Sequence, residues 1–349
     1  MRCCGWATST LQSIMRLLCL PLLVSAGLLS PMQSRAATEM EERAAISISI
    51  RSAFVVEDFA RLEEASDGYR TTKSRTPSGI WKLTLFHAAI NGAIRESARG
   101  RERETAFRDL ESKTTRWVQR YPNSPSAHLA HSSVFIQHAW AIRGSGYAPT
   151  VKPDAWEPFR RYIAMARANL ETHKSIAAVD PRWYELMLSV ARDESWERGE
   201  FDRLLDEALS REPLFYQTYF LALEYLLPKW HGGKHDIEDF ARKAVERTSS
   251  QEGQGMYARI YWFASQAQFK TQLFSDSMVV WPHMKSGFDD VIARYPDAWN
   301  LNNYAKFACL AGDKAKAREL LERIKSAIVS EAWQPPAMLE RCAKWASQT

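Results

Sequence analysis

The sequence predicts an all-α protein, a tetratricopeptide-like solenoid or superhelix of stacked α-α hairpins. Apolar residues recur at helical spacing, as in the stripe that starts at Phe201 and continues at Leu205. Prolines separate these periodic segments. The interval between Pro181 and Pro213 is close to the tetratricopeptide period of about 34 residues. Such repeats bury their apolar faces only by stacking on neighbours, so we expect a single helical-repeat domain over residues 37–349.

The periodic segments can be followed along the chain. The alternation from Ile46 to Ile50 is the only candidate strand, but it leads directly into a helical stripe, so we expect it to be helical. Further helical stripes occupy residues 201–209, 240–245 and 317–324. A proline fixes φ at a value that suits the start of a helix and disfavours its continuation. The joints between segments are therefore expected at Pro122, Pro181, Pro213 and Pro296.

The last unit, at about residues 297–327, is the most similar to a tetratricopeptide repeat. Its small residues Ala305, Ala308 and Ala317 allow two helices to approach closely, and Gly312 suits a left-handed turn between them.

Residues 1–36 have the three parts of a cleavable signal peptide. Positive residues precede the apolar run Leu17–Leu29, and this run is shorter than the roughly 20 residues that span a bilayer. Small residues at Ser34 and Ala36 predict cleavage before Ala37. We expect a periplasmic or secreted protein with no stable membrane insertion after cleavage. The alternative is an uncleaved anchor.

Removal of this leader changes the charge and the cysteine content. The formal net charge falls from +5 to +2, because the leader contains three arginines and no acidic residue. A nearly neutral chain with interspersed charges gives no basic footprint for nucleic acid, so we expect no nucleic-acid partner. Cys309 and Cys342 are the two cysteines that remain. In an oxidising compartment they either form a disulfide or stay as two buried thiols.

Several segments together resemble a bacterial family, domain of unknown function 4034. The matching stretches are RTPSGIWKL at 75–83, AWAIRGSGY at 139–147 and LLPKWHGG at 226–233. The resemblance covers most of the chain after the leader. It implies an exported, tetratricopeptide-like helical protein, and it brings no catalytic residues to carry over.

The candidate binding residues lie where loops interrupt the helical pattern. Such loops often carry function, and glycine, proline, arginine and aromatic residues cluster in these three. The candidates are Arg75, Trp81, Arg143, Tyr147, Trp230 and His231. Most of the other tryptophans, spread over the predicted helices, are expected to pack in the core.

No catalytic residue, metal ligand or cofactor site is predicted. The sequence contains no P-loop, no His-Glu-x-x-His and no nucleophile elbow. His128 and His131 are three positions apart on a predicted helix, with His138 further along, but no third ligand of the right type is evident. His231, His235 and Asp236 form a second candidate, although the glycines between them equally suit a tight turn, so we expect structural or solvated roles for both clusters.

Three hypotheses for the function follow. The first is a scaffold in the bacterial periplasm whose groove binds an unknown protein or peptide partner. The second is a hydrolase or glycan-processing enzyme with a site built from the loops at 75–79, 143–147 and 228–236. The third is a structural component of an envelope assembly. Because the common catalytic motifs are missing, the sequence favours binding over catalysis.

Overall fold

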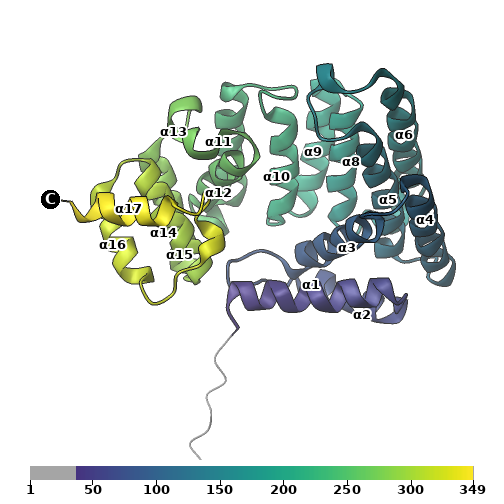
Figure 1. Cartoon of the computed structure of the whole chain (residues 1–349), viewed down its shortest axis with the longest axis horizontal. Coiled ribbons are helices and arrows are strands. Elements are labelled where there is room, and N and C mark those ends of the chain that lie inside the picture. Colours follow the sequence, from purple (N-terminus) through teal and green to yellow (C-terminus); the bar gives the residue numbers. More distant parts are fainter. Residues whose placement is uncertain (1–36, 349) are drawn as a thin grey trace, which may run out of the picture. The chain divides into compact units, whose positions relative to one another are not determined.

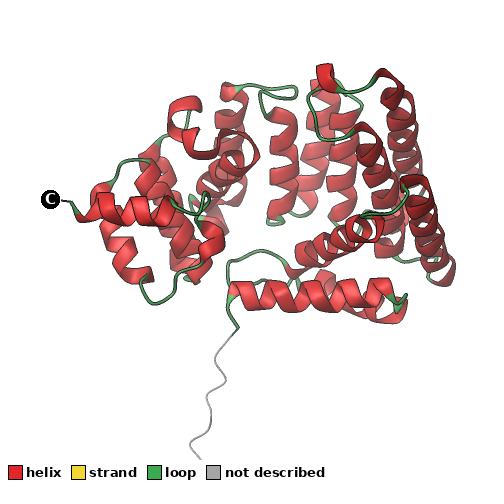
Figure 2. Ribbon diagram, viewed as in Figure 1, coloured by secondary structure: helices red, strands yellow, loops and turns green. Residues whose placement is uncertain are grey.

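The computed structural model describes residues 37–348, and the predicted signal peptide lies outside them. Within this range the protein is all-α, as predicted, and the only β feature is one isolated bridge between Arg75 and Trp81. Figure 2 shows helices joined mostly by short loops. None of the described helices is long and apolar enough to cross a membrane.

The N-terminal half of the described residues is built from eight α-helices and two short 3₁₀ turns. The α-helices are α1 (Glu39–Val55), α2 (Phe59–Thr72), α3 (Lys82–Ala98), α4 (Arg103–Arg120), α5 (Pro125–Arg143), α6 (Trp156–Thr172), α7 (Lys174–Ala177) and α8 (Arg182–Asp193). The residues from Ile46 to Ile50 lie inside α1, which confirms the helical interpretation of that alternation.

The C-terminal half continues with α9 (Arg198–Arg211), α10 (Tyr216–Leu226), α11 (Lys234–Glu252), α12 (Gly255–Ala264), α13 (Leu273–Asp276), α14 (Trp281–Arg294), α15 (Ala298–Leu310), α16 (Lys314–Ile324) and α17 (Met338–Ser347). A π-helical turn, η3 (Ser265–Phe269), follows α12 directly, and the short 3₁₀ turn η4 (Lys270–Gln272) follows it. A further 3₁₀ turn, η5 (Ser330–Ala332), precedes α17.

Local sequence explains where many of these helices begin. Thr38 and Glu41 form a reciprocal capping box at the start of α1. The Ser124 side chain caps α5, whose first residue is a proline. Asp297 and Asp313 cap α15 and α16 in the same way. Each of the four predicted proline joints falls between two helices.

Helices pack mainly on their neighbours along the chain. Helix α5 packs on α4 and α6, α12 packs on α11 and α14, and α15 packs on α16 (Figure 1). Helix α1 packs on α3 and also contacts α15, which is far from it in sequence. The first described helix therefore contacts a helix near the C-terminus.

The buried apolar residues form two clusters. The larger one extends from Leu129 to Ala346, and the smaller one joins α1 to α5 with Phe215. Most tryptophans belong to or pack against these clusters, as expected, and Trp117, Trp183 and Trp333 are among the most buried.

Candidate binding site

A cavity of about 330 Å³ opens among α10, α12, α15 and the start of the described chain. Its volume is within the range of small-ligand and side-chain pockets. Four aromatic rings and two arginines dominate its wall, which contains no acidic side chain. The lining residues are Arg43, Ile80, Gln217, Phe220, Arg259, Trp262, Phe263, Gln266 and Trp299. We call this the arginine–aromatic cavity.

Arg259 is the most unusual residue of the arginine–aromatic cavity. Its side chain is buried, with 4% of its surface exposed. One guanidinium nitrogen donates to the Ser78 carbonyl at 2.9 Å, and the group lies over the ring of Tyr216 at 4.7 Å. Within residues 37–348 it pairs with no carboxylate, and its Nε has no hydrogen-bond partner. A buried cation without a counter-ion is costly, so this arginine is suited to receive a ligand anion.

The aromatic residues form the apolar part of the wall. Phe220 and Phe263 stack with their centroids 5.1 Å apart, and Trp262 lies 6.0 Å from Trp299. The indole nitrogen of Trp262 is buried and has no hydrogen-bond partner in the described structure. A buried indole N–H usually donates to a partner, so a ligand acceptor would satisfy it.

Arg43 completes the positive side of the cavity. Its guanidinium lies 4.9 Å from the ring centroid of Trp299, and its Nε donates to Glu39 at 2.5 Å. Burial would raise the pKa of Glu39, but Arg43 and hydrogen bonds from Thr76 and Ser78 outweigh burial and lower it. Glu39 therefore stays ionised and holds Arg43 in place.

The loop between α2 and α3 is fixed beside this cavity by contacts from distant helices. The Ser78 amide donates to Glu39 at 2.8 Å, and the Ser78 carbonyl accepts from Arg259 and from Asn300. Gly79 has φ of +93°, and a Cβ there would come within 2.8 Å of the Tyr295 ring. Only glycine fits this close approach without strain, which explains the glycine of the RTPSGIWKL stretch.

Two of the predicted site residues, Arg75 and Trp81, lie behind the wall of the arginine–aromatic cavity. Arg75 donates to the Gly79 carbonyl at 2.6 Å and lies 4.9 Å from the Tyr216 ring centroid. Trp81 is buried, with its ring 5.3 Å from that of Phe215. Both residues support the loop and do not line the cavity.

The other predicted site residues lie in a second group around Trp140. The Arg143 guanidinium lies over the Trp140 ring at 4.8 Å, and the Trp230 ring is 6.0 Å from it. His231 lies next to Trp230, with its Nε2 3.2 Å from the Arg192 carbonyl. The structure thus brings the 143–147 and 228–236 loops together, whereas Arg75 contacts Gly79, Tyr216 and Tyr295 beside the arginine–aromatic cavity.

The two loops of this second group differ in exposure and in backbone packing. Tyr147 is exposed, with 74% of its surface accessible. A Cβ on Gly232 would come within 2.2 Å of the Leu226 carbonyl oxygen, so the paired glycines of the LLPKWHGG stretch allow a tight turn.

The remaining predicted residues have structural partners. Cys309 on α15 and Cys342 on α17 are paired in a disulfide, with Cα atoms 5.9 Å apart. His131 is 2.8 Å from the Thr114 hydroxyl, and burial lowers its pKa to about 4. In residues 37–348 there is no group of three or more histidine, cysteine or acidic residues that could hold a metal ion.

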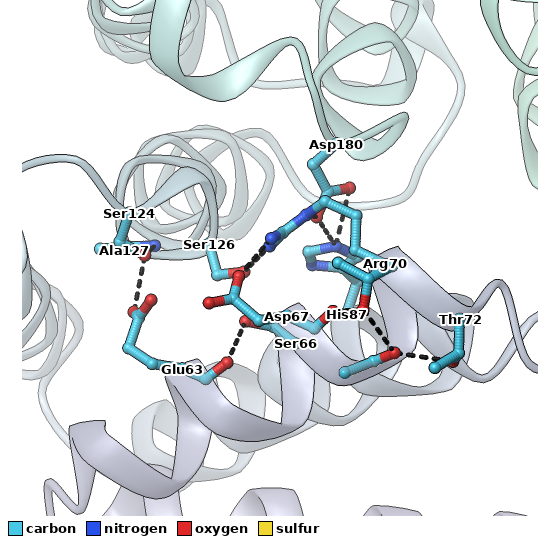
Figure 3. A network of polar contacts seen from close by, with 12 residues as sticks. Glu63, Ser66, Asp67, Arg70, Thr72, His87, Ser124, Ser126, Ala127 and Asp180 are labelled. Atoms are coloured by element: carbon cyan, nitrogen blue, oxygen red, sulfur yellow. Dashed lines mark hydrogen bonds and ion pairs between the residues drawn. The ribbon is translucent and has the colours of Figure 1, made fainter.

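A buried polar network in the N-terminal half contrasts with Arg259. Asp180 is fully buried, and both of its carboxylate oxygens lie 3.1 Å from His87 Nε2. It also accepts from Arg70 at 3.3 Å (Figure 3). The Arg182 amide donates to it at 2.9 Å. Arg70 reaches on to Ser126. Within residues 37–348 each charge in this network has a partner, so its role is to hold α2, α3, α5 and α8 together.

Sequence reasoning missed Arg259, although the sequence contains a signal for it. The segment from Gly255 to Ala264 is apolar except for this one arginine. A single charge inside an apolar helix is expected to be buried, and a buried charge needs either a partner or a function.

Comparison with known proteins adds nothing to this geometry: the chain matches no family model, no curated protein and no solved structure.

Proposed function

We propose that the protein is an exported, tetratricopeptide-like scaffold that binds an extended peptide segment of a partner protein in the arginine–aromatic cavity. The observation that carries this proposal is Arg259, a buried guanidinium with no carboxylate partner in the described residues, on the wall of an aromatic cavity. Arginine and aromatic side chains in a desolvated pocket are the residues that contribute most to peptide and protein binding.

The helical organisation supports a solenoid of this kind. The two helices of a hairpin pack on each other, as α11 does on α12 and α15 on α16, and α10, α12 and α15 contribute parts of the cavity wall. Stacked hairpins present such helices along a shared binding surface. The same proposal includes export through the predicted signal peptide at residues 1–36. It also includes the resemblance to domain of unknown function 4034.

The wall of the cavity defines the chemistry of the peptide. Phe220, Phe263 and Trp299 suit a large apolar or aromatic side chain. Arg43 and Arg259, with no acid in the wall, suit a carboxylate beside that side chain. The amides of Gln217 and Gln266 can donate to and accept from a peptide backbone. The expected ligand is an extended segment with a bulky apolar residue next to an acidic one.

Fluorescence anisotropy with short labelled peptides tests this proposal. One set has a central tryptophan or leucine flanked by glutamate, and a matched set has lysine in place of glutamate. We expect the glutamate set to bind and the lysine set not to bind. Arg259→Met should weaken binding at least tenfold, on the scale of a central interface residue. Arg160→Met removes the same charge from an exposed site on α6 and should bind like wild type.

Two results would overturn the proposal: equal binding of both peptide sets, or unchanged affinity in Arg259→Met. A Trp299→Leu variant guards against misfolding as an explanation, because Trp299 is only partly buried. It should retain the wild-type unfolding midpoint while losing affinity.

A further inference from the structure

A second cavity, of about 530 Å³, lies where α15, the π-helical turn η3 and the segment before α17 meet. Lys306 and Asn303 line it from α15, Ser265 from the π-helical turn, and Arg341 from α17. We call it the Lys306 cavity. Irregular turns of this kind inside helices are frequent at functional sites.

Lys306 is buried, with 7% of its surface exposed, and has no ionic or hydrogen-bond partner within residues 37–348. The Nζ of Lys306 lies 5.1 Å from the ring centroid of Phe307. Helix α15 contains no other charged residue. A buried ammonium without a counter-ion is costly in free energy, and proteins rarely keep one without a function.

The surroundings of Lys306 add positive charge. Lys270 and Arg341 also line the cavity, and Glu331 is the one acid of its wall. On the neighbouring helix α14, Lys285 is paired with Asp313, the residue that caps α16, at 2.8 Å. Burial alone lowers the pKa of Lys306, to about 8.

Asn303 supplies a second unpaired group. Its Nδ2 donates to the Trp299 carbonyl at 2.9 Å, but its buried Oδ1 has no hydrogen-bond partner in the described structure. Asn303 and Lys306 are three positions apart on one face of α15. A ligand that carries both an oxyanion and a hydroxyl or amine would satisfy the two groups together.

We propose that the Lys306 cavity binds a small organic oxyanion, a carboxylate or a phosphate ester that also bears a hydroxyl or amine. Lys306 is the counter-cation, and Asn303 Oδ1 accepts a hydrogen bond from the ligand. This site is separate from the arginine–aromatic cavity and does not rest on the peptide-binding proposal, although Gln266 lines both.

Binding at this site should be coupled to the uptake of a proton. Near pH 8 to 9, part of the Lys306 population is neutral in the free protein. A bound anion favours the ammonium form, so each binding event draws protons from the buffer. A lysine already paired in the free protein would show no such coupling.

Isothermal titration calorimetry of the mature protein at pH 8.5 tests the proposal in two buffers of different ionisation enthalpy. The ligands are glycerol 3-phosphate and lactate, with propane-1,2-diol as the neutral control. We expect at least one of the two anions to bind with proton uptake and the diol not to bind. The anion that binds more tightly shows whether the site takes a phosphate ester or a carboxylate.

Variants separate the role of the charge from that of the fold. Lys306→Met should lower the affinity for the anion at least tenfold, whereas Lys344→Met, at an exposed site on α17 outside the cavity, should leave it unchanged. Lys306→Arg keeps the charge but does not release its proton, so any remaining binding should lose the proton uptake. Equal binding of the diol, unchanged affinity in Lys306→Met, or no binding of either anion at millimolar concentration would overturn the proposal.

Discussion

Two sets of buried charges in this fold differ in how they are paired. In the N-terminal half, the carboxylate of Asp180 contacts His87, Arg70 and the Arg182 amide. In the C-terminal half, Lys306 has no described ionic or hydrogen-bond partner, and it lines a cavity. Paired buried charges fasten helices together, whereas an unpaired charge beside a cavity reduces the stability of the empty protein. The first set is therefore structural, and the second is suited to binding.

The largest expected effect of a substitution concerns the paired set. Asp180→Ala leaves His87 without its carboxylate and Arg70 with only the mostly exposed Asp67, which should lower the free energy of unfolding by about 3 to 5 kcal/mol. Thermal unfolding followed by circular dichroism measures this loss. Asp67→Ala removes a partner of Arg70 that is mostly exposed, so it should cost less than about 1 kcal/mol. Equal losses in the two variants would contradict the structural role of Asp180.

The disulfide between Cys309 and Cys342 comes next in size. It closes a loop between residues 33 positions apart and fastens α17, which carries Arg341, to the helix of Lys306. The Cys309→Ser/Cys342→Ser double variant should lose about 2 to 4 kcal/mol of stability, and oxyanion binding should weaken as the cavity wall loosens. Denaturant unfolding with and without reductant measures the first effect. If reductant still lowers the stability of the double variant, the loss of stability does not come from this disulfide.

The pH dependence of stability has the opposite sign and separates Lys306 from the paired set. The pKa of Lys306 is about 8 in the folded protein and close to 10.5 when unfolded. Between these values the unfolded state holds more protons, so stability should rise with pH from 8 to 10.5. Below pH 8 both states are charged and the cost of burial is fully present. This rise should be absent from Lys306→Met, as denaturant unfolding at several pH values would show.

The helices could be predicted from the sequence to a large extent, because apolar spacing and proline joints are local signals. The segment from Ile46 to Ile50 and the joint at Pro213 were both predicted correctly on that basis. The cavities could not be predicted, because they depend on contacts between residues far apart in sequence, such as Ser78 with Arg259.

The candidate site residues show the same limit. Arg143 and Trp230 do come together, but around Trp140 and Arg192, which lie on helices and not in the loops that the sequence singles out. Arg259 is the only charged residue of α12, and Lys306 is the only charged residue of α15. A single charged residue in such a helix indicates a buried charge, but it does not show whether the fold gives that charge a counter-ion.

The most direct test of the account is the sign of the stability change in Lys306→Met. Methionine keeps most of the apolar stem and removes the charge, so the free energy of unfolding at pH 7 should rise, by up to about 3 kcal/mol if the whole pKa shift is realised. Urea unfolding of this variant beside wild type and Asp180→Ala gives the answer. The account predicts a more stable Lys306→Met and a less stable Asp180→Ala. A loss of stability in both would show that Lys306 is a paired, structural charge like Asp180.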